Sequence, residues 1–208
     1  MTDSIRQVIR LKIYVDTNQQ DGKHETKHRY LISKGYELVF LPLPEGDYIL
    51  ENEKIESMLA DKDKRKCKVV KNDISGLFDV SVDTKRNIQE IIGNICGKGH
   101  ARFHDECARA MNKGLKFYIL IENEDGVKTI DDLETWDNPR IARWKRIKEH
   151  HEKGRWGNVP IPKRPPTSGE GLAKSMRTME KRYGVKFLFC RPEEAGRRVV
   201  ELLTGEEV

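Results

Sequence analysis

Leu77-Phe-Asp-Val-Ser-Val-Asp-Thr-Lys85 predicts a buried β-strand that ends in a charged tripeptide, Asp83-Thr84-Lys85. Side chains two residues apart in a strand point to the same face of a sheet, so Asp83 and Lys85 should project together. Phe78, Val80 and Val82 should then face a hydrophobic core. A carboxylate beside an ammonium group, joined by a carboxylate from another strand, can hold a divalent cation and orient a water molecule near a phosphate. The tripeptide therefore raises the hypothesis of metal-dependent phosphodiester hydrolysis.

Strands alternate with helices on both sides of this stretch. The alternating or continuously apolar runs that predict strands are residues 9–15, 37–43, 47–50, 115–121 and 185–190. Between them, Ile88, Ile91, Ile92 and Ile95 keep the spacing of an amphipathic helix. Alternation of this kind predicts an α/β fold, with a mixed central sheet and helices on both of its faces.

The composition describes a chain of 208 residues with 35% charged and 37% hydrophobic residues, which fits one domain. No stretch approaches the ~18 consecutive apolar residues of a membrane helix. The N-terminus also lacks the apolar core of a signal peptide. Four cysteines without a CxxC pair argue against a zinc site or a disulfide framework. We therefore expect a cytoplasmic protein that does not enter a membrane.

Two charged segments depart from the α/β pattern. Residues 51–76 are weakly patterned, and we expect them to form a surface insertion. Residues 128–166 should form a basic helix followed by a Pro-rich connector. Between residues 140 and 164 there are nine Lys/Arg against two acids, which suits a phosphate backbone but equally suits a solvated helix face. The apolar stripe of the same helix includes Trp144, for which we expect core packing.

Three acids end or begin predicted strands: Asp16, Asp47 and Asp83. Mg²⁺ prefers oxygen ligands and keeps several waters, so one or two carboxylates together with a substrate phosphate are sufficient to bind it. Two histidine pairs with helical spacing, His24/His28 and His100/His104, lack an apparent third zinc ligand, and we expect structural or surface roles for them.

Several short motifs occur along the chain in an order that is typical of one protein family. They are Val15-Asp16-Thr17, Gly46-Asp47-Tyr48, Val82-Asp83-Thr84-Lys85, Arg102 and Tyr118-Ile-Leu-Ile-Glu122. Together they resemble the XPF-type nuclease domain, a branch of the PD-(D/E)xK restriction-endonuclease-like superfamily. The resemblance covers roughly residues 8–125 and 167–204. It implies a single nuclease domain over residues 1–208, with a restriction-endonuclease-like mixed sheet flanked by helices.

The resemblance also implies roles for individual residues around Mg²⁺ or Mn²⁺. Asp47 and Asp83 match the two carboxylate ligands of the metal, and the backbone carbonyl of Thr84 matches a third ligand. Lys85 matches the catalytic lysine, and Asp16 matches an acid close to the metal. The catalytic set implied is thus Asp47, Asp83, Lys85 and Asp16.

DNA contacts follow from the resemblance and from the basic segment. Arg102 matches a helix arginine near the scissile strand, and Trp156 is an aromatic residue that could stack on unpaired bases. The full set of expected DNA-binding residues is Arg86, Arg102, Arg143, Lys145, Arg146, Arg155 and Trp156.

The chain departs from the family pattern in several ways. Asn18-Gln19 stands where the family has Arg-Glu, Asp83-Thr84 replaces Glu-Arg, and the insertion at 51–73 separates two motifs that are usually close together. We also expect no tandem helix-hairpin-helix unit after the nuclease domain. Substrate choice therefore does not carry over with the fold.

The function that these observations predict is a Mg²⁺-dependent endonuclease acting on branched or structured DNA in recombination, repair or phage DNA processing. A short nuclease domain of this type is similar to phage and mobile-element proteins. Members of the family generally dimerise, which implies a homodimer. Gly97-Lys-Gly-His100 lacks the length and the Lys-Ser/Thr of a phosphate loop, so no nucleotide cofactor is expected. The alternatives are a non-catalytic DNA-binding relative and a partner-binding protein.

Overall fold

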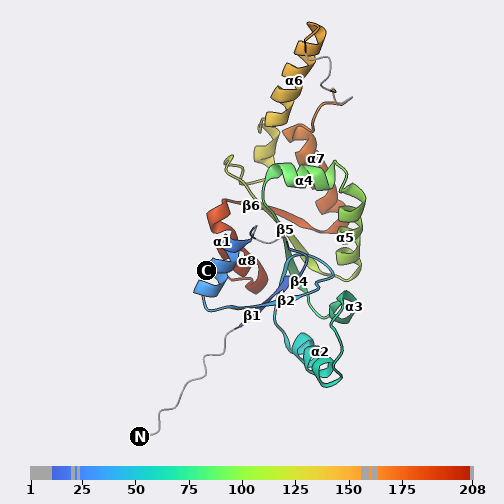
Figure 1. Cartoon of the computed structure of the whole chain (residues 1–208), viewed down its shortest axis with the longest axis vertical. Coiled ribbons are helices and arrows are strands. Elements are labelled where there is room, and N and C mark those ends of the chain that lie inside the picture. Colours follow the sequence, from blue (N-terminus) through green and yellow to red (C-terminus); the bar gives the residue numbers. More distant parts are fainter. Residues whose placement is uncertain (1–10, 20–21, 23, 156–159, 161–163, 207–208) are drawn as a thin grey trace.

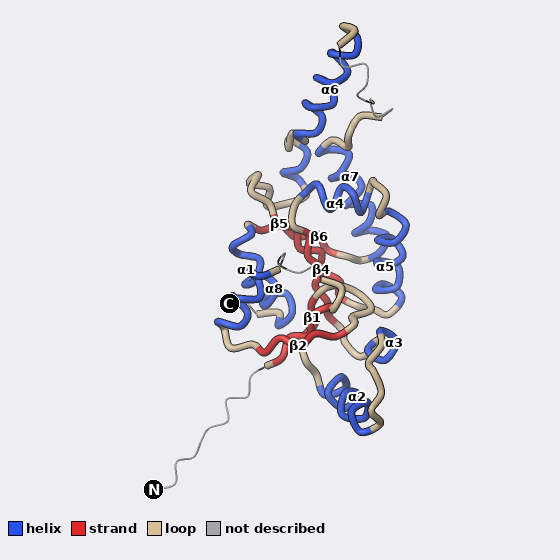
Figure 2. The backbone as a smooth tube through the Cα atoms, in the orientation of Figure 1, coloured by secondary structure: helices blue, strands red, loops and turns tan. Residues whose placement is uncertain are grey.

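A computed structural model of the protein describes residues 11–19, 22, 24–155, 160 and 164–206. Six strands form one sheet in the order β2-β1-β3-β4-β5-β6. β3 is antiparallel to both of its neighbours, whereas the other adjacent pairs are parallel. The predicted fold class, a mixed central sheet flanked by helices, is therefore confirmed (Figure 2). The strands are β1 (Lys12–Asp16), β2 (Glu37–Leu41), β3 (Tyr48–Leu50), β4 (Val80–Lys85), β5 (Lys116–Glu122) and β6 (Lys186–Cys190).

Helices cover both faces of the sheet, as Figure 1 shows. On one face, α1 (Glu25–Ser33) and α8 (Ala195–Thr204) pack over a cluster that includes Val82 and Leu120. On the other face lie α4 (Ile88–Ile95), α5 (His100–Asn112) and α7 (Gly169–Tyr183), over a cluster that includes Ile119 and Ile121. Consecutive apolar residues of β5 thus belong to opposite cores, as a strand buried on both faces requires. The described residues also form two 3₁₀ turns, η1 (Asp131–Glu134) and η2 (Pro192–Glu194).

The strand that carries Asp83 starts at Val80 and not at Leu77. The backbone of Leu77 is engaged elsewhere: its N–H donates to Ile74 O (3.0 Å), and its carbonyl accepts from Asn52 Nδ2 (2.9 Å). Phe78 therefore lies outside the strand and packs in the core opposite the one that contains Val82. The prediction that Phe78 and Val82 share a face is wrong for this reason.

The segment 51–76 is a folded two-helix unit with a buried side, α2 (Glu53–Lys64) and α3 (Lys71–Ile74). Ile55 and Ile74 are fully buried in the main core. Asn52 caps α2 by accepting a 3.0 Å hydrogen bond from the N–H of Ile55. The sequence pattern is weak here because most positions around these isoleucines are charged. Ile55 and Ile74, together with the partly buried Met58 and Leu59, nevertheless pack the unit against the main core.

Helix α6 (Pro139–Glu152) starts as predicted, with Asn138 as N-cap and Pro139 at the first helical position. It buries none of its residues, and Figure 1 shows it extending away from the sheet at one end of the molecule. The expected core packing of Trp144 is wrong, because this side chain is only half-buried. Throughout the described ranges, no helix combines the length and the apolar character needed to cross a bilayer.

Candidate active site

The strand order brings the three predicted acids to one edge of the sheet. Asp16 ends β1, Asp47 immediately precedes β3, and Asp83 lies near the end of β4. Because β3 is antiparallel to β1 and β4, its first residues meet their last ones. The backbone N–H of Asp16 donates to Asp47 O (2.9 Å), and that of Asp47 donates to Val82 O (2.9 Å). Backbone hydrogen bonds thus fix the relative positions of the three acids.

A tight turn at Gly46 presents Asp47 to this edge. Gly46 has a φ of +75°, and a Cβ atom at this position would lie 2.2 Å from Ser81 Oγ. Only glycine fits such a position without strain. The N–H of Gly46 donates to Glu106 Oε1 (3.1 Å), and Ser81 Oγ donates to Glu45 O (2.8 Å). The turn is therefore held from both α5 and β4.

The carboxylate of Asp47 is oriented by Thr84. Asp47 Oδ2 accepts one hydrogen bond from the Thr84 N–H (2.9 Å) and another from Thr84 Oγ1 (2.6 Å). Asp47 Oδ1 accepts no hydrogen bond from the part of the chain that the structure describes. In an extended strand the N–H and C=O of one residue point to the same edge, so the Thr84 carbonyl faces the Asp47 side as well. Oδ1 and this carbonyl are thus available to the pocket.

Asp83 and Lys85 form a buried ion pair, as their shared strand face predicts. Lys85 Nζ lies 2.5 Å from Asp83 Oδ2, and the two residues are only 9% and 5% exposed. Burial raises the pKa of Asp83 to about 8; Lys85 opposes this rise, whereas Asp47 and Glu106 add to it. Burial alone would lower the pKa of Lys85, but Asp83 and Asp47 outweigh burial and raise it above its ordinary value. Lys85 is therefore an ammonium ion throughout the physiological pH range.

Asp16 is turned toward the loop that follows β2. Its Oδ1 accepts from the N–H of Leu43 (3.1 Å), and both carboxylate oxygens lie 3.2 Å from Asn18 Nδ2. Asn18 is one of the departures from the family pattern. Its neutral amide donates to Asp16 at the position where the family pattern has an arginine.

A pocket of about 670 Å³ gathers most of the predicted site residues. Its lining includes Asp16, Asp47, Asp83, Thr84, Lys85, Arg86 and Arg102. The other expected DNA contacts are not part of this pocket. Arg143, Lys145 and Arg146 lie on α6, and Arg155 follows it. Trp156 lies outside the described residues.

No catalytic or metal-binding role was predicted from the sequence for several residues that line this pocket. Glu106 and Arg109 stand four and seven residues after Arg102 on α5, so the three share one helix face. That polar stripe, beside the apolar one of Phe103 and Cys107, was the signal that could have revealed them. His24 also lines the pocket, and burial, helped by Lys27, lowers its pKa to about 4.

The residues present fit a divalent cation bound mainly by two carboxylates. No group of three or more His, Cys, Asp or Glu side chains comes together as a metal cluster within the described ranges. Asp47, Asp83 and the Thr84 carbonyl nevertheless form the two-carboxylate set that is sufficient for Mg²⁺ with its waters. Asp83 Oδ2 is buried, and its contact with Lys85 is an ion pair. Among the described residues, this oxygen accepts no hydrogen bond of proper geometry. A buried oxygen of this kind is stabilised by a further cation.

No protein-family model and no curated protein sequence matches the chain. Among solved structures, the chain is similar to XPF from Aeropyrum pernix, with 14% sequence identity and a TM-score of 0.48. The similarity covers 92% of this chain and 63% of that one, so the chain spans less than two thirds of that structure's length. At this level of identity the likeness says nothing about activity, substrate or partners.

Proposed function

We propose that the chain is a metal-dependent DNA endonuclease that hydrolyses phosphodiester bonds in branched or otherwise structured DNA. One observation carries the proposal: the buried Asp83–Lys85 pair lies in the same pocket as the oriented carboxylate of Asp47. Two carboxylates and an ammonium group in one pocket match the needs of phosphodiester hydrolysis. The carboxylates attract a cation, and the ammonium group attracts the negative charge of a phosphate.

The residues of the pocket divide these tasks. Asp47, Asp83 and the Thr84 carbonyl would hold Mg²⁺ or Mn²⁺, with Asp16 at the edge of the site. A bound ion of this kind polarises a phosphoryl oxygen and lowers the pKa of a bound water. Lys85, with its raised pKa, acts as a hydrogen-bond donor and not as a base. It would orient the attacking water or neutralise the charge that develops on the phosphate.

Arginines and lysines around the pocket would bind the DNA backbone. Arg86 and Arg102 are exposed at the pocket and suit phosphates next to the scissile bond. Lys148 and Lys153 pair with Glu152 and Glu149, but the basic side chains of α6 and its end that are expected to bind DNA make no ion pair within the described part of the chain, which leaves them available to phosphates farther away. They are Arg143, Lys145, Arg146 and Arg155. Base stacking by Trp156 and formation of a homodimer remain predictions.

The test is cleavage of flap and junction DNA in Mg²⁺ by the wild type and by Asp47→Asn and Asp83→Asn variants. Each substitution removes a carboxylate charge from the pocket, so we expect rate losses of at least about 100-fold. Asp79→Asn is the matched control, because Asp79 is exposed just before β4 and does not line the pocket.

The outcomes separate the proposal from its rivals. Equal cleavage by all four proteins would contradict the assignment of Asp47 and Asp83 to the active site. A wild type that binds DNA tightly without cutting it would be a non-catalytic DNA-binding relative. A wild type that does not bind DNA, or binds it independently of salt, would be a partner-binding protein, because phosphate contacts weaken steeply with salt.

A further inference from the structure

The unit formed by α2 and α3 ends in a strongly basic segment. Between residues 62 and 71 there are six basic residues (62, 64, 65, 66, 68 and 71) and one acid, Asp63. Lys62 pairs with Asp73 and Lys64 with Asp61. The remaining four, Arg65, Lys66, Lys68 and Lys71, are exposed and form no ion pair with any residue that the structure describes. Their charge is therefore not neutralised within the fold.

This basic segment is held in place. Asp73 Oδ2 accepts from the N–H of Val70 (2.8 Å) and lies 2.7 Å from Lys62 Nζ, which closes the loop between α2 and α3. Val69 packs against the main core, next to Lys68. Fully buried Ile74 anchors the other end of α3. A ligand that binds Lys68 and Lys71 would thus meet a backbone that is already ordered, which lowers the entropy cost of binding.

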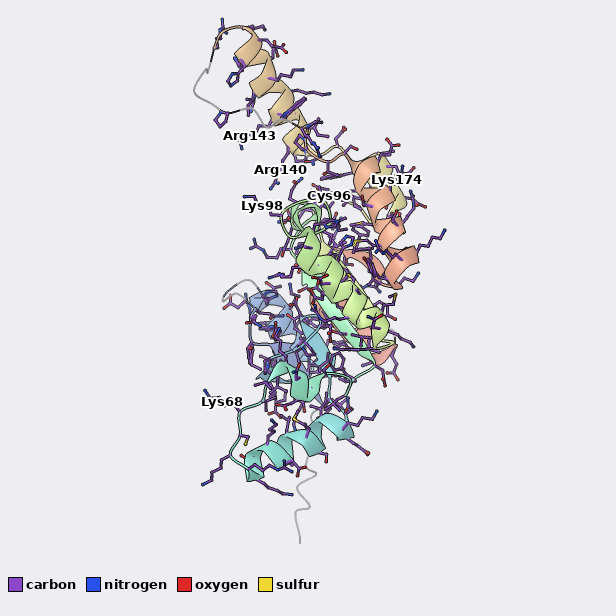
Figure 3. All side chains as sticks on the ribbon, turned by 90° about the vertical axis from the view of Figure 1, so that its right-hand side faces the viewer. Lys68, Cys96, Lys98, Arg140, Arg143 and Lys174 are labelled. Atoms are coloured by element: carbon purple, nitrogen blue, oxygen red, sulfur yellow. The ribbon has the colours of Figure 1, made fainter. Side chains whose placement is uncertain are left out.

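Lys71 connects this segment to the candidate active site. Its side chain lines the same pocket as Asp47 and Asp83. Figures 1 and 2 show α2 and α3 at one end of the sheet and α4 and α6 at the other. In Figure 3, Lys68 lies at the lower end of one side of the molecule, and Lys98, Arg140 and Arg143 lie along the upper part of the same side. Basic residues therefore flank the pocket from both ends.

We propose that Lys68 and Lys71 bind the backbone of the DNA substrate on the side of the scissile phosphate opposite to α4 and α6. The inference rests on the proposed function and adds to it a way of engaging the substrate. With phosphate contacts on both sides of the scissile phosphate, the protein binds DNA that continues past the cut in both directions. Internal cleavage is then favoured over removal of terminal nucleotides.

The test compares wild type, the double variant Lys68→Gln/Lys71→Gln and the control Lys54→Gln. Lys54 is an exposed lysine of α2 that does not line the pocket. Binding of fluorescein-labelled flap DNA is followed by anisotropy in EDTA, so that no metal-dependent cleavage occurs. Each lost phosphate contact should make the negative slope of log K against log[salt] shallower by about 0.9. It should also reduce the affinity near 0.15 M salt by roughly fivefold. We expect the double variant to lose two contacts and the control to lose none.

Hydroxyl-radical footprinting then shows on which side of the cut the contacts to the DNA backbone are lost. We expect the double variant to lose protection of the backbone on one side of the cut only, with an unchanged melting temperature. Equal slopes and footprints in all three proteins would overturn the inference, even where the wild type cleaves DNA. Conversely, a wild type that binds but never cleaves would overturn the nuclease function, while the slopes would still decide the role of Lys68 and Lys71. Absence of any DNA binding would overturn both.

Discussion

Thr84 Oγ1 donates a 2.6 Å hydrogen bond to Asp47 Oδ2, and the backbone N–H of Thr84 donates a second one, 2.9 Å long, to the same oxygen. The middle residue of the Asp-Thr-Lys tripeptide thus links β4 to the turn that precedes β3. The sequence predicted only a role for its carbonyl. The side chain orients the carboxylate of Asp47, whose Oδ1 accepts no hydrogen bond from the described residues.

Thr84→Val should weaken the site without unfolding it. Valine has nearly the shape of threonine but lacks the hydroxyl, and the hydrogen bond from the backbone N–H remains. We expect a loss of about 0.5–1.5 kcal/mol in the unfolding free energy, and a cleavage rate lower by about tenfold because Asp47 is less well oriented. Urea denaturation and single-turnover cleavage would measure the two effects. Thr84→Ser keeps the hydroxyl and should behave like the wild type; a serine variant as impaired as the valine one would contradict this role.

Metal binding should depend on pH through Asp83. Its raised pKa of about 8 means that a proton competes with the cation below that pH, because only the carboxylate form binds a metal. The Mg²⁺ affinity should therefore rise from pH 6 to pH 8 by up to about tenfold per unit, with release of up to one proton. Calorimetric titrations in buffers of different ionisation enthalpy measure both quantities. Asp79→Asn should retain this dependence and Asp83→Asn should lose it, whereas a constant wild-type affinity over this range would refute the assignment.

Gly46→Ala should destabilise the protein far more than Gly35→Ala. Both glycines have a positive φ, +75° and +88°, so alanine costs about 1–2 kcal/mol of backbone strain at either position. Only at Gly46 would the new Cβ atom clash, 2.2 Å from Ser81 Oγ, whereas nothing lies within 4 Å at Gly35. Overpacking should add about 1–3 kcal/mol. Chemical denaturation of both variants gives the comparison, and equal losses would show that the turn is not tightly packed.

Lys27 of α1 and Glu122 of β5 form a buried ion pair. Removing one partner should destabilise the protein strongly, whereas removing both should cost much less. Lys27→Met would leave an unpaired carboxylate almost fully buried, at a cost of about 3–5 kcal/mol. The double variant Lys27→Met/Glu122→Leu should recover at least half of that loss. Arg29→Met on the same helix is the control, since its pair with Glu25 is exposed and contributes about 0.5 kcal/mol or less. A double variant no more stable than Lys27→Met would argue against this account.

Local patterns were sufficient to predict the class of the fold and the main acids of the candidate site. Alternating or continuously apolar runs mark the strands, and spacing of three and four marks helices such as α4, because both patterns follow from backbone geometry and burial. The shared face of Asp83 and Lys85 follows from the same rule and needs no knowledge of the rest of the chain. The order of Asp16, Asp47 and Asp83 along the chain was likewise visible in the sequence.

The neighbours of these acids were decided only by the tertiary structure. No local pattern states that β3 inserts antiparallel between β1 and β4, which brings Asp47 to Thr84. The pKa of Asp83 is raised because elements far away in sequence bury it. Lys71 likewise lines the pocket only because the fold brings α3 next to the ends of β3 and β4. In the same way, the sequence of α6 predicts a helix, but only the tertiary structure shows that it extends away from the sheet and buries none of its residues (Figure 1). Strand and helix periods are properties of neighbouring residues, whereas burial, charge environment and pocket lining come from contacts between distant segments.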